Sequence, residues 1–330
     1  MGTKDNVTKT YMSNNTVFAD AFNFYIYQGE PVIKPEDLIE LDTTESVNIF
    51  EKYKTTAGSS EQRYRDVLKS AVIRQKGKTV YAILGIENQS DIHYAMPVKN
   101  LIYDGLQYGK QVNAAAAKHK EKKDMFSSAE FLSGFSKKDR LTPVVTLVVY
   151  FGTERWDGAR SLHEMMEADD DKVLRYVQDY HINLIEPAGL EPAELDKLTS
   201  SLREVLGYIK YSNNKQELLT FVNNNMMMDV EAARVINAVT NTHIDIPEDA
   251  EEVNMCKAIE DLINDSKAEG RLEGLNEGLI RRKEEKHANI VAFLMRIPNI
   301  ELAEEIFGVS ADEVMKLASD NGIVIGNAKR

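Results

Sequence analysis

Cysteine is almost absent from this 330-residue chain, and its scarcity removes several classes of protein. The one cysteine, Cys256, cannot form an internal disulfide or a cysteine-based zinc site, so we expect a reduced, cytoplasmic protein. No apolar run approaches the roughly 18–20 residues that span a bilayer, and residues 1–15 lack the apolar segment of a signal peptide. We therefore expect no membrane partner. The phosphate-binding glycine motifs of nucleotide-binding proteins are also missing, which predicts no nucleotide cofactor.

Charge is present in an uneven distribution. The whole chain carries a net charge of −13, which argues against a generally basic nucleic-acid binder. Between Glu61 and Arg140, however, 15 Lys and Arg residues stand against 9 Asp and Glu residues. A basic segment in an acidic protein is where a polyanion would bind. The alternative is a solvated helix end, because residues 118–123 alone supply much of the excess.

The hydrophobic pattern of the first half predicts alternating helices and strands. Apolar residues recur at helical spacing over about residues 16–27, and Pro97 is well placed to begin a helix that runs to about residue 122. Two strand-like runs, 64–73 and 79–87, flank turn residues and predict a β-hairpin. The continuous apolar run 141–151 is typical of a strand buried on both faces. This order predicts a mixed α/β sheet with flanking helices.

The second half is expected to be mostly helical. Residues 161–245 predict a helical extension packed on the core, and residues 298–330 predict a small helical hairpin in which Ser310 caps the second helix. Between them, residues 246–297 contain three glycines spaced four residues apart, Gly270, Gly274 and Gly278. Two interpretations remain open: a long exposed helix whose glycine stripe admits a second copy of the chain, or a mobile linker.

Two acidic residues of the hairpin are candidates for a metal site. Asp66 lies near the start of the first strand, and Glu87 lies near the end of the second, two residues before Gln89. Because hairpin ends meet and residues two apart share a face, we expect these side chains to project together. Mg²⁺, or Mn²⁺ in its place, needs only one or two carboxylates, and the backbone carbonyl of Asn88 is a further candidate ligand. The alternative is a pair of ordinary solvated carboxylates.

The sequence around these acids resembles the PD-(D/E)XK nucleases of the Rpn family, a group of recombination-promoting nucleases also described as transposases. The resemblance covers about residues 12–240. It lies in short segments whose order and spacing match together, namely Phe18–Asn23, Tyr64–Leu68, Leu84–Gln89, His93–Lys99, Thr146–Gly152 and Trp156–Gly158.

This resemblance implies a nuclease-like core over residues 12–160 and a Mg²⁺-dependent endonuclease that acts on DNA. Asp66 and Glu87 match the two metal ligands of the family, whereas Gln89 occupies a position at which many of these nucleases have lysine. Glutamine donates hydrogen bonds but brings no charge and cannot act as a general base. Related nucleases often place another acid on the first helix, where Asp20 is the candidate here. A solvated helix-surface carboxylate is the alternative interpretation of Asp20.

The helix that follows the acids carries candidate contacts to DNA phosphates. Lys99, Tyr103 and Gln107 are spaced at i, i+4 and i+8 and therefore share one face, and Lys110 continues near it. Tyr103 also fits an apolar core position, and Lys99 also fits a solvated surface.

A second class of function stays open. The missing lysine at position 89 and the acidic total charge are both compatible with a DNA-binding or assembly protein that keeps the fold without hydrolysis.

Overall fold

The computed structural model describes residues 3–42, 44–45, 63–64, 66–75, 78–125, 127–167, 171–222, 227–240, 242–247 and 249–325. The chain divides into two compact units, residues 1–259 and 260–330. No helix among the described residues is both long and apolar enough to cross a membrane.

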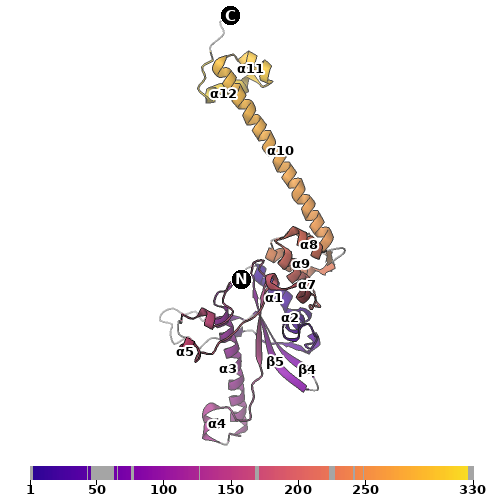
Figure 1. Ribbon diagram of the computed structural model, residues 1–330, viewed down its shortest axis with the longest axis vertical. Coiled ribbons are helices and arrows are strands. Elements are labelled where there is room, and N and C mark those ends of the chain that lie inside the picture. Colours follow the sequence, from indigo (N-terminus) through magenta and orange to yellow (C-terminus); the bar gives the residue numbers. More distant parts are fainter. Residues whose placement is uncertain are drawn as a thin grey trace. The chain divides into compact units, whose positions relative to one another are not determined.

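A five-stranded mixed sheet forms the centre of the first unit (Figure 1). Its order is β1 (Leu38–Glu40), β4 (Val67–Gln75), β5 (Lys78–Gln89), β6 (Val144–Tyr150) and β7 (Asn183–Ile185). The pairs β1–β4 and β4–β5 are antiparallel, whereas β5–β6 and β6–β7 are parallel. The predicted hairpin, the doubly buried strand and the mixed α/β class are confirmed; the tip residues 76–77 of the hairpin lie outside the described residues.

Helices cover both faces of this sheet. One face receives α3 (Met96–Lys122), whose Met96 packs in a buried cluster with Val148, Tyr150 and Trp156. The other face receives α2 (Asn15–Tyr27), because Lys69 of β4 places its ammonium 5.1 Å from the ring centroid of Phe18. The helices predicted over 16–27 and from Pro97 to about 122 are therefore present.

A helix that was not expected from the sequence pattern precedes α2. It is α1 (Thr3–Ser13), which contacts β4, β5 and α2. The buried amine of Lys69 donates to the carbonyl oxygen of Ser13 at 2.5 Å and to the side chain of Asn15. This lysine therefore connects the α1–α2 junction to the sheet, and its burial lowers its pKa.

The remaining elements of the first unit are short. They are η1 (Pro35–Asp37), β2 (Thr44–Glu45), β3 (Arg63–Tyr64), α4 (Ser128–Ser133), η3 (His163–Met165), α5 (Asp171–Leu174), η4 (Pro187–Gly189), α6 (Pro192–Leu195), α7 (Leu202–Tyr211), α8 (Lys215–Phe221), β8 (Met227–Asp229), α9 (Val230–Thr240) and β9 (Glu252–Asn254). The extension predicted over 161–245 is thus not purely helical, because β7 within it pairs with β6 and completes the sheet.

The second unit is built on one long helix. Helix α10 (Met255–Arg296) is continuous through all three glycines, so the structure supports the helix rather than the mobile linker. Its end packs against α11 (Ile300–Phe307) and α12 (Ala311–Asp320) around Ile290 and Leu294. The Ser310 side chain caps α12, as predicted from the sequence, by accepting from the backbone amide of Glu313.

The middle of α10 lies in solvent on every side. Leu272, Leu275 and Leu279 are each more than half exposed and lie three and four residues apart, so they share a face of the helix. Self-association through this helix stays a prediction.

Candidate functional site

The parallel pairing of β5 with β6 decides which face receives Glu87. Glu87 lies opposite Val148, and Val148 packs against Met96 at the start of α3. Residues opposite each other in a ladder project to the same face, so the Glu87 side chain projects toward α3. There the carboxylate is completely buried, and its Oε2 lies 2.8 Å from the Nζ of Lys99. The alternative of a solvated carboxylate is therefore wrong for Glu87.

Asp66 meets the same strand end from β4. It precedes Val67, which lies opposite Ile86, so Asp66 lies beside the end of β5 at Glu87. Its Oδ2 accepts the backbone N–H of Asn88 at 2.8 Å. This hydrogen bond places the Asp66 carboxylate against the Glu87–Asn88 peptide.

The electrostatic surroundings of Asp66 combine burial with two cations. Burial raises the pKa of Asp66 above its ordinary value, and this is the largest effect. The hydrogen bond from Asn88 and the charges of Lys99 and Lys9 lower this pKa, and the charge of Asp5 raises it slightly. Lys99 thus acts on both acids, since it pairs with Glu87 and also attracts the carboxylate of Asp66.

Gln89 lies at the end of β5, on the same face as Glu87 by strand alternation. Its Nε2 donates to the backbone carbonyl of Asn88 at 2.9 Å. That carbonyl is the candidate metal ligand expected from the sequence. Gln89 therefore covers it, and a metal at this carbonyl would have to share its oxygen with the Gln89 amide.

The donors at this strand end fit a small hard cation. Asp66 and Glu87 offer carboxylate oxygens, and Mg²⁺ takes one or two carboxylates while it keeps water on its other positions. Among the described residues, no three His, Cys, Asp or Glu side chains form a group that could hold a metal. The site thus fits a two-carboxylate Mg²⁺ site and does not fit a closed site built only from protein ligands.

The structure does not bring Asp20 to this pair of acids. Asp20 is buried on α2, and its carboxylate accepts hydrogen bonds from the backbone amides and the hydroxyls of Thr199 and Ser200, at 2.6–3.1 Å. The expectation that Asp20 is a metal ligand is therefore wrong. The alternative, a solvated carboxylate on the helix surface, is wrong as well. The role of Asp20 is to hold α2 to the segment that enters α7.

The expected DNA-contact face of α3 lies mostly inside the protein. Tyr103 and Gln107 are 4% and 5% exposed, so the expectation that they contact DNA phosphates is wrong. Tyr103 instead occupies a core position, which was the alternative interpretation of this residue. Lys110 is exposed, and its contact with a phosphate stays a prediction. Lys99 is 22% exposed along its side chain and is engaged by Glu87, so it lies within the acidic site and not on an open basic surface.

Two interactions along α3 were missed because they join residues distant in sequence. Asp104 accepts from the hydroxyls of Thr146 and Tyr180, both at 2.6 Å, and ties α3 to β6 and to the segment before β7. Gln111 forms a pair of hydrogen bonds with the backbone of Thr142. These contacts hold α3 against the sheet and thereby fix Lys99 beside Glu87.

Lys9 of α1 was also missed as a neighbour of the acids. No motif marks it, and its only sequence signal is a position on a helix that carries Asp5 in its first turn. Its charge lowers the pKa of Asp66, so α1 contributes to the electrostatics of the strand end.

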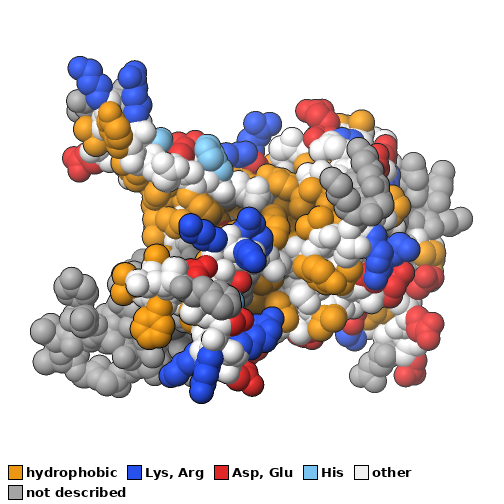
Figure 2. All heavy atoms as spheres, turned by 90° about the horizontal axis from the view of Figure 1, so that it is seen from below, with side chains coloured by type: hydrophobic (Ala, Val, Ile, Leu, Met, Phe, Trp, Pro, Cys, Tyr) orange, Lys and Arg blue, Asp and Glu red, His pale blue; other side chains and the backbone are white. Residues whose placement is uncertain are grey.

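The basic excess between residues 61 and 140 does not gather around the acids. Among its described members, Lys69 is buried, Arg74 pairs with Asp37 at 2.6 Å, and Lys99 pairs with Glu87. The cations of residues 118–140 are all exposed. Figure 2 looks at the molecule from the α4 end and shows Lys and Arg side chains beside hydrophobic ones on this face.

Comparison with known proteins yields one match. A family model described as "Putative transposase, YhgA-like" matches residues 5–236, which include Asp66, Glu87, Gln89 and Lys99. No curated protein and no solved structure match the chain. The matched range covers more than two thirds of the 330 residues and nearly all of the first unit. The chain therefore belongs to the YhgA-like transposase family.

Proposed function

We propose that this protein is a metal-dependent DNA endonuclease of the PD-(D/E)XK type, acting with Mg²⁺ or Mn²⁺. The observation that carries the proposal is the meeting of Asp66, Glu87 and Lys99 at one end of the sheet. Asp66 lies against the Asn88 amide at 2.8 Å, and Lys99 lies 2.8 Å from Glu87. The transposase description of the family supports DNA as the substrate.

Each residue of this group has a separate chemical task. Asp66 and Glu87 are the residues that would hold the cation, and a bound divalent cation supplies charge that neutralises the phosphodiester as it is attacked. Lys99 pairs with the buried Glu87 carboxylate, and this opposite charge offsets part of the free-energy cost of burying that group. Its ammonium also places a positive charge next to the phosphate that would enter the site.

Gln89 replaces a charged group with a hydrogen-bond donor. Its amide turns to the Asn88 carbonyl, and it can orient a water or a phosphate oxygen but cannot accept a proton at neutral pH. In this chain the lysine that lies beside the two acids is Lys99, which belongs to α3 and not to β5. Lys99 therefore supplies the cation that position 89 lacks.

A plasmid-nicking assay tests the proposal. We expect the full-length protein to convert supercoiled plasmid to relaxed and linear forms with Mg²⁺ or Mn²⁺, and to leave it intact in EDTA. Asp66→Asn, purified in parallel, is the control for contaminating nucleases because it keeps the shape of the side chain and removes its charge. Plasmid that stays intact with both metals, at protein concentrations that bind it, would contradict the proposal.

Two substitutions at Gln89 measure the task of this residue. Gln89→Ala should slow cleavage by about 10- to 100-fold, because it removes an orienting hydrogen bond but no metal ligand. Gln89→Lys should cleave at least as fast as the wild type if glutamine is a weakened substitute for lysine. The initial nicking rates of the three proteins at one Mg²⁺ concentration provide the comparison. A Gln89→Ala variant as inactive as Asp66→Asn would assign Gln89 a direct part in catalysis.

The second candidate function is DNA binding without hydrolysis. The pairing of Lys99 with Glu87 favours it, because a cation that binds Glu87 must compete with this ammonium. The nicking assay separates the two functions, since a binding protein would retard the plasmid on a gel in Mg²⁺ without nicking it.

A further inference from the structure

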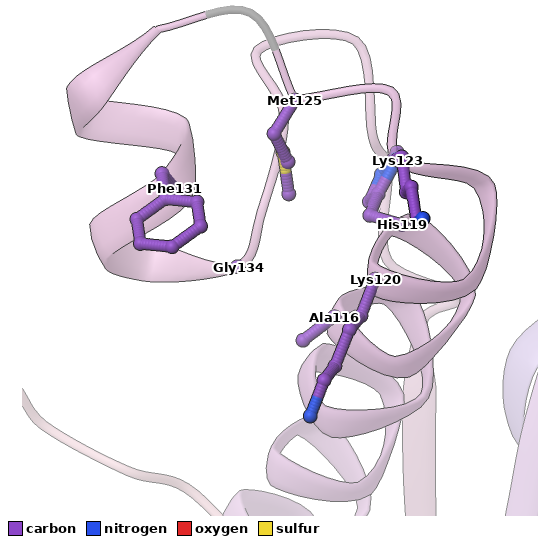
Figure 3. Close-up of a pocket in the computed structure, with 7 residues that line it drawn as sticks. All are labelled: Ala116, His119, Lys120, Lys123, Met125, Phe131 and Gly134. Carbon is purple, nitrogen blue, oxygen red and sulfur yellow. The ribbon is translucent and has the colours of Figure 1, made fainter.

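A cavity lies at the far end of α3 from the acids. Its volume is about 470 Å³, and its walls come from the last turns of α3, the connection that follows, and α4 (Figure 3). The residues that line it are Ala116, His119, Lys120, Lys123, Met125, Phe131 and Gly134. The volume falls in the range of about 300–1,000 Å³ that is usual for small-ligand sites.

The cavity depends on a close approach of α4 to α3. Gly134 ends α4 with a φ of 69°, and a Cβ at this position would lie 2.6 Å from the Cβ of Ala116. His119 fixes the connection between the helices, since its ring nitrogens lie 2.6 Å from Asp124 and 2.8 Å from Asp139. These hydrogen bonds raise the pKa of His119. The close approach of Gly134 to Ala116 and the hydrogen bonds of His119 therefore fix the walls of the cavity.

The walls of the cavity combine an aromatic face with cations. Phe131 is 83% exposed, and Figure 3 shows it with Met125 across from Ala116 and Lys120 on α3. The exposed ring leaves an aromatic face open to a partner beside the cations. A nucleobase stacks on such a ring, and lysines at the rim bind the phosphates on either side of it.

The charge around the cavity favours an anionic partner. The exposed cations of this region are Lys118, Lys120, Lys122, Lys123, Lys137, Lys138 and Arg140. Of the four acids in the same stretch, Asp124 and Asp139 are engaged by His119, and Glu130 accepts from the hydroxyls of Ser127 and Ser136. The protein as a whole is acidic, so this concentration of cations is where a polyanion would bind.

A concave site of this size is better suited to an unpaired base than to a duplex. A base in a duplex is stacked and paired, so it can enter a concave pocket only after it leaves the helix. An unpaired base has both faces accessible.

The cavity lies far from the acids along α3. Lys120 is 21 residues along α3 from Lys99, which corresponds to about 32 Å at 1.5 Å per residue. That span equals about nine nucleotides of a stacked strand.

We infer that this cavity is a binding site for single-stranded DNA, in which one unpaired base stacks on Phe131 while Lys120 and Lys123 hold its flanking phosphates. The inference rests on the proposed action on DNA and adds the form of DNA that the protein recognises. It also explains why the basic residues lie far from the acids: they hold the strand at a distance from the point of cleavage.

Fluorescence anisotropy with a labelled 20-nucleotide oligo(dT) and a labelled blunt duplex tests the inference, in EDTA and again with Ca²⁺. Phe131→Ala should weaken binding of the single strand about five-fold or more, the lower end of what one stacked base contributes. Its effect on the duplex should stay below about two-fold. Phe131→Trp should restore the affinity, because it keeps an aromatic face. Leu132→Ala is the matched control, since Leu132 is similarly exposed but is not among the residues that line the cavity.

The lysines have a separate test in the salt dependence of binding. Lys120→Ala with Lys123→Ala should reduce the slope of log affinity against log salt by about 1.4, or about 0.7 for each phosphate contact with a single strand. Lys316→Ala, an exposed position in the second unit, should leave this slope unchanged. Equal affinity of wild type and Phe131→Ala for oligo(dT) would overturn the inference.

Other occupants of the cavity lead to different results. If a second copy of the chain fills it, sedimentation analysis without DNA will show a mass that falls on Phe131→Ala, and the inference is wrong. Cleavage of plasmid without an effect of Phe131 would contradict the inference and leave the proposed function standing. Binding that depends on Phe131, without cleavage under any metal, would support the inference and contradict the proposed function.

Discussion

Replacement of Glu87 by glutamine is expected to reduce metal-dependent DNA cleavage by at least about a hundredfold. The substitution keeps the shape of a side chain that is completely buried and removes the charge that would hold the cation. Metal stabilisation of a phosphodiester in its transition state contributes several kcal/mol, and about 2.7 kcal/mol corresponds to a hundredfold in rate. Initial rates of plasmid nicking at saturating Mg²⁺ measure the loss.

A double variant separates the loss of chemistry from a loss of folding. Glu87→Gln leaves the ammonium of Lys99 beside a neutral side chain, in a place where it is only 22% exposed. Removing one partner of such a pair destabilises the protein, whereas removing both costs less. Glu87→Gln combined with Lys99→Met should therefore recover stability and stay inactive. A double variant that cleaves at the wild-type rate would show that these residues have no part in catalysis.

Truncation of Asp20 is expected to have the largest effect on stability. Asp20→Ala removes an acceptor from two backbone amides and two hydroxyls at Thr199 and Ser200, where α2 meets the start of α7. Buried donors that lose a charged partner cost about 3–5 kcal/mol together. The one tryptophan of the chain, Trp156, is buried in the first unit, so its fluorescence during urea unfolding reports on that unit.

Two further variants establish the cause of that effect. Asp20→Asn keeps one acceptor oxygen and should lose less stability than Asp20→Ala. Asp196→Ala breaks an ion pair with Arg203 in which Asp196 is 65% exposed, and should cost less than about 1 kcal/mol. If Asp20→Ala unfolds at the wild-type urea concentration but no longer cleaves DNA, Asp20 belongs to the catalytic site after all.

The elements that could be predicted are those whose signal lies within a short stretch of chain. The hairpin follows from two β-rich runs around turn residues, and it is sufficient to bring Asp66 and Glu87 to one strand end. The buried strand 144–150 follows from its continuous apolar run, and the cap at Ser310 follows from its position before an amphipathic helix. The family resemblance and the family match agree over most of the first unit.

The parts that could not be predicted depend on partners far away in the sequence. Lys99 has the same spacing to Tyr103 whether it faces solvent or Glu87, and only the packing of α3 on β6 decides between them. Tyr103 and Gln107 are buried for the same reason. Helix α1 carries little apolar periodicity of its own, and its contacts with the sheet and with α9 supply the stability that its sequence does not show.

The sequence by itself determined the class of the fold, the pairing of Asp66 with the end of β5, and the absence of a charged residue at position 89, because strand alternation and hairpin closure act over a few residues. Only the tertiary structure decided that Asp20 accepts hydrogen bonds from the segment before α7 and that Lys99 forms an ion pair with Glu87. It also decided that the exposed cations of the basic segment gather at the far end of α3. Each of these depends on which surfaces pack together over long sequence separations, 179 residues in the case of Asp20 and Thr199. No local pattern encodes such a choice, because a charged side chain on a helix looks the same in sequence whether its partner is water or a buried group.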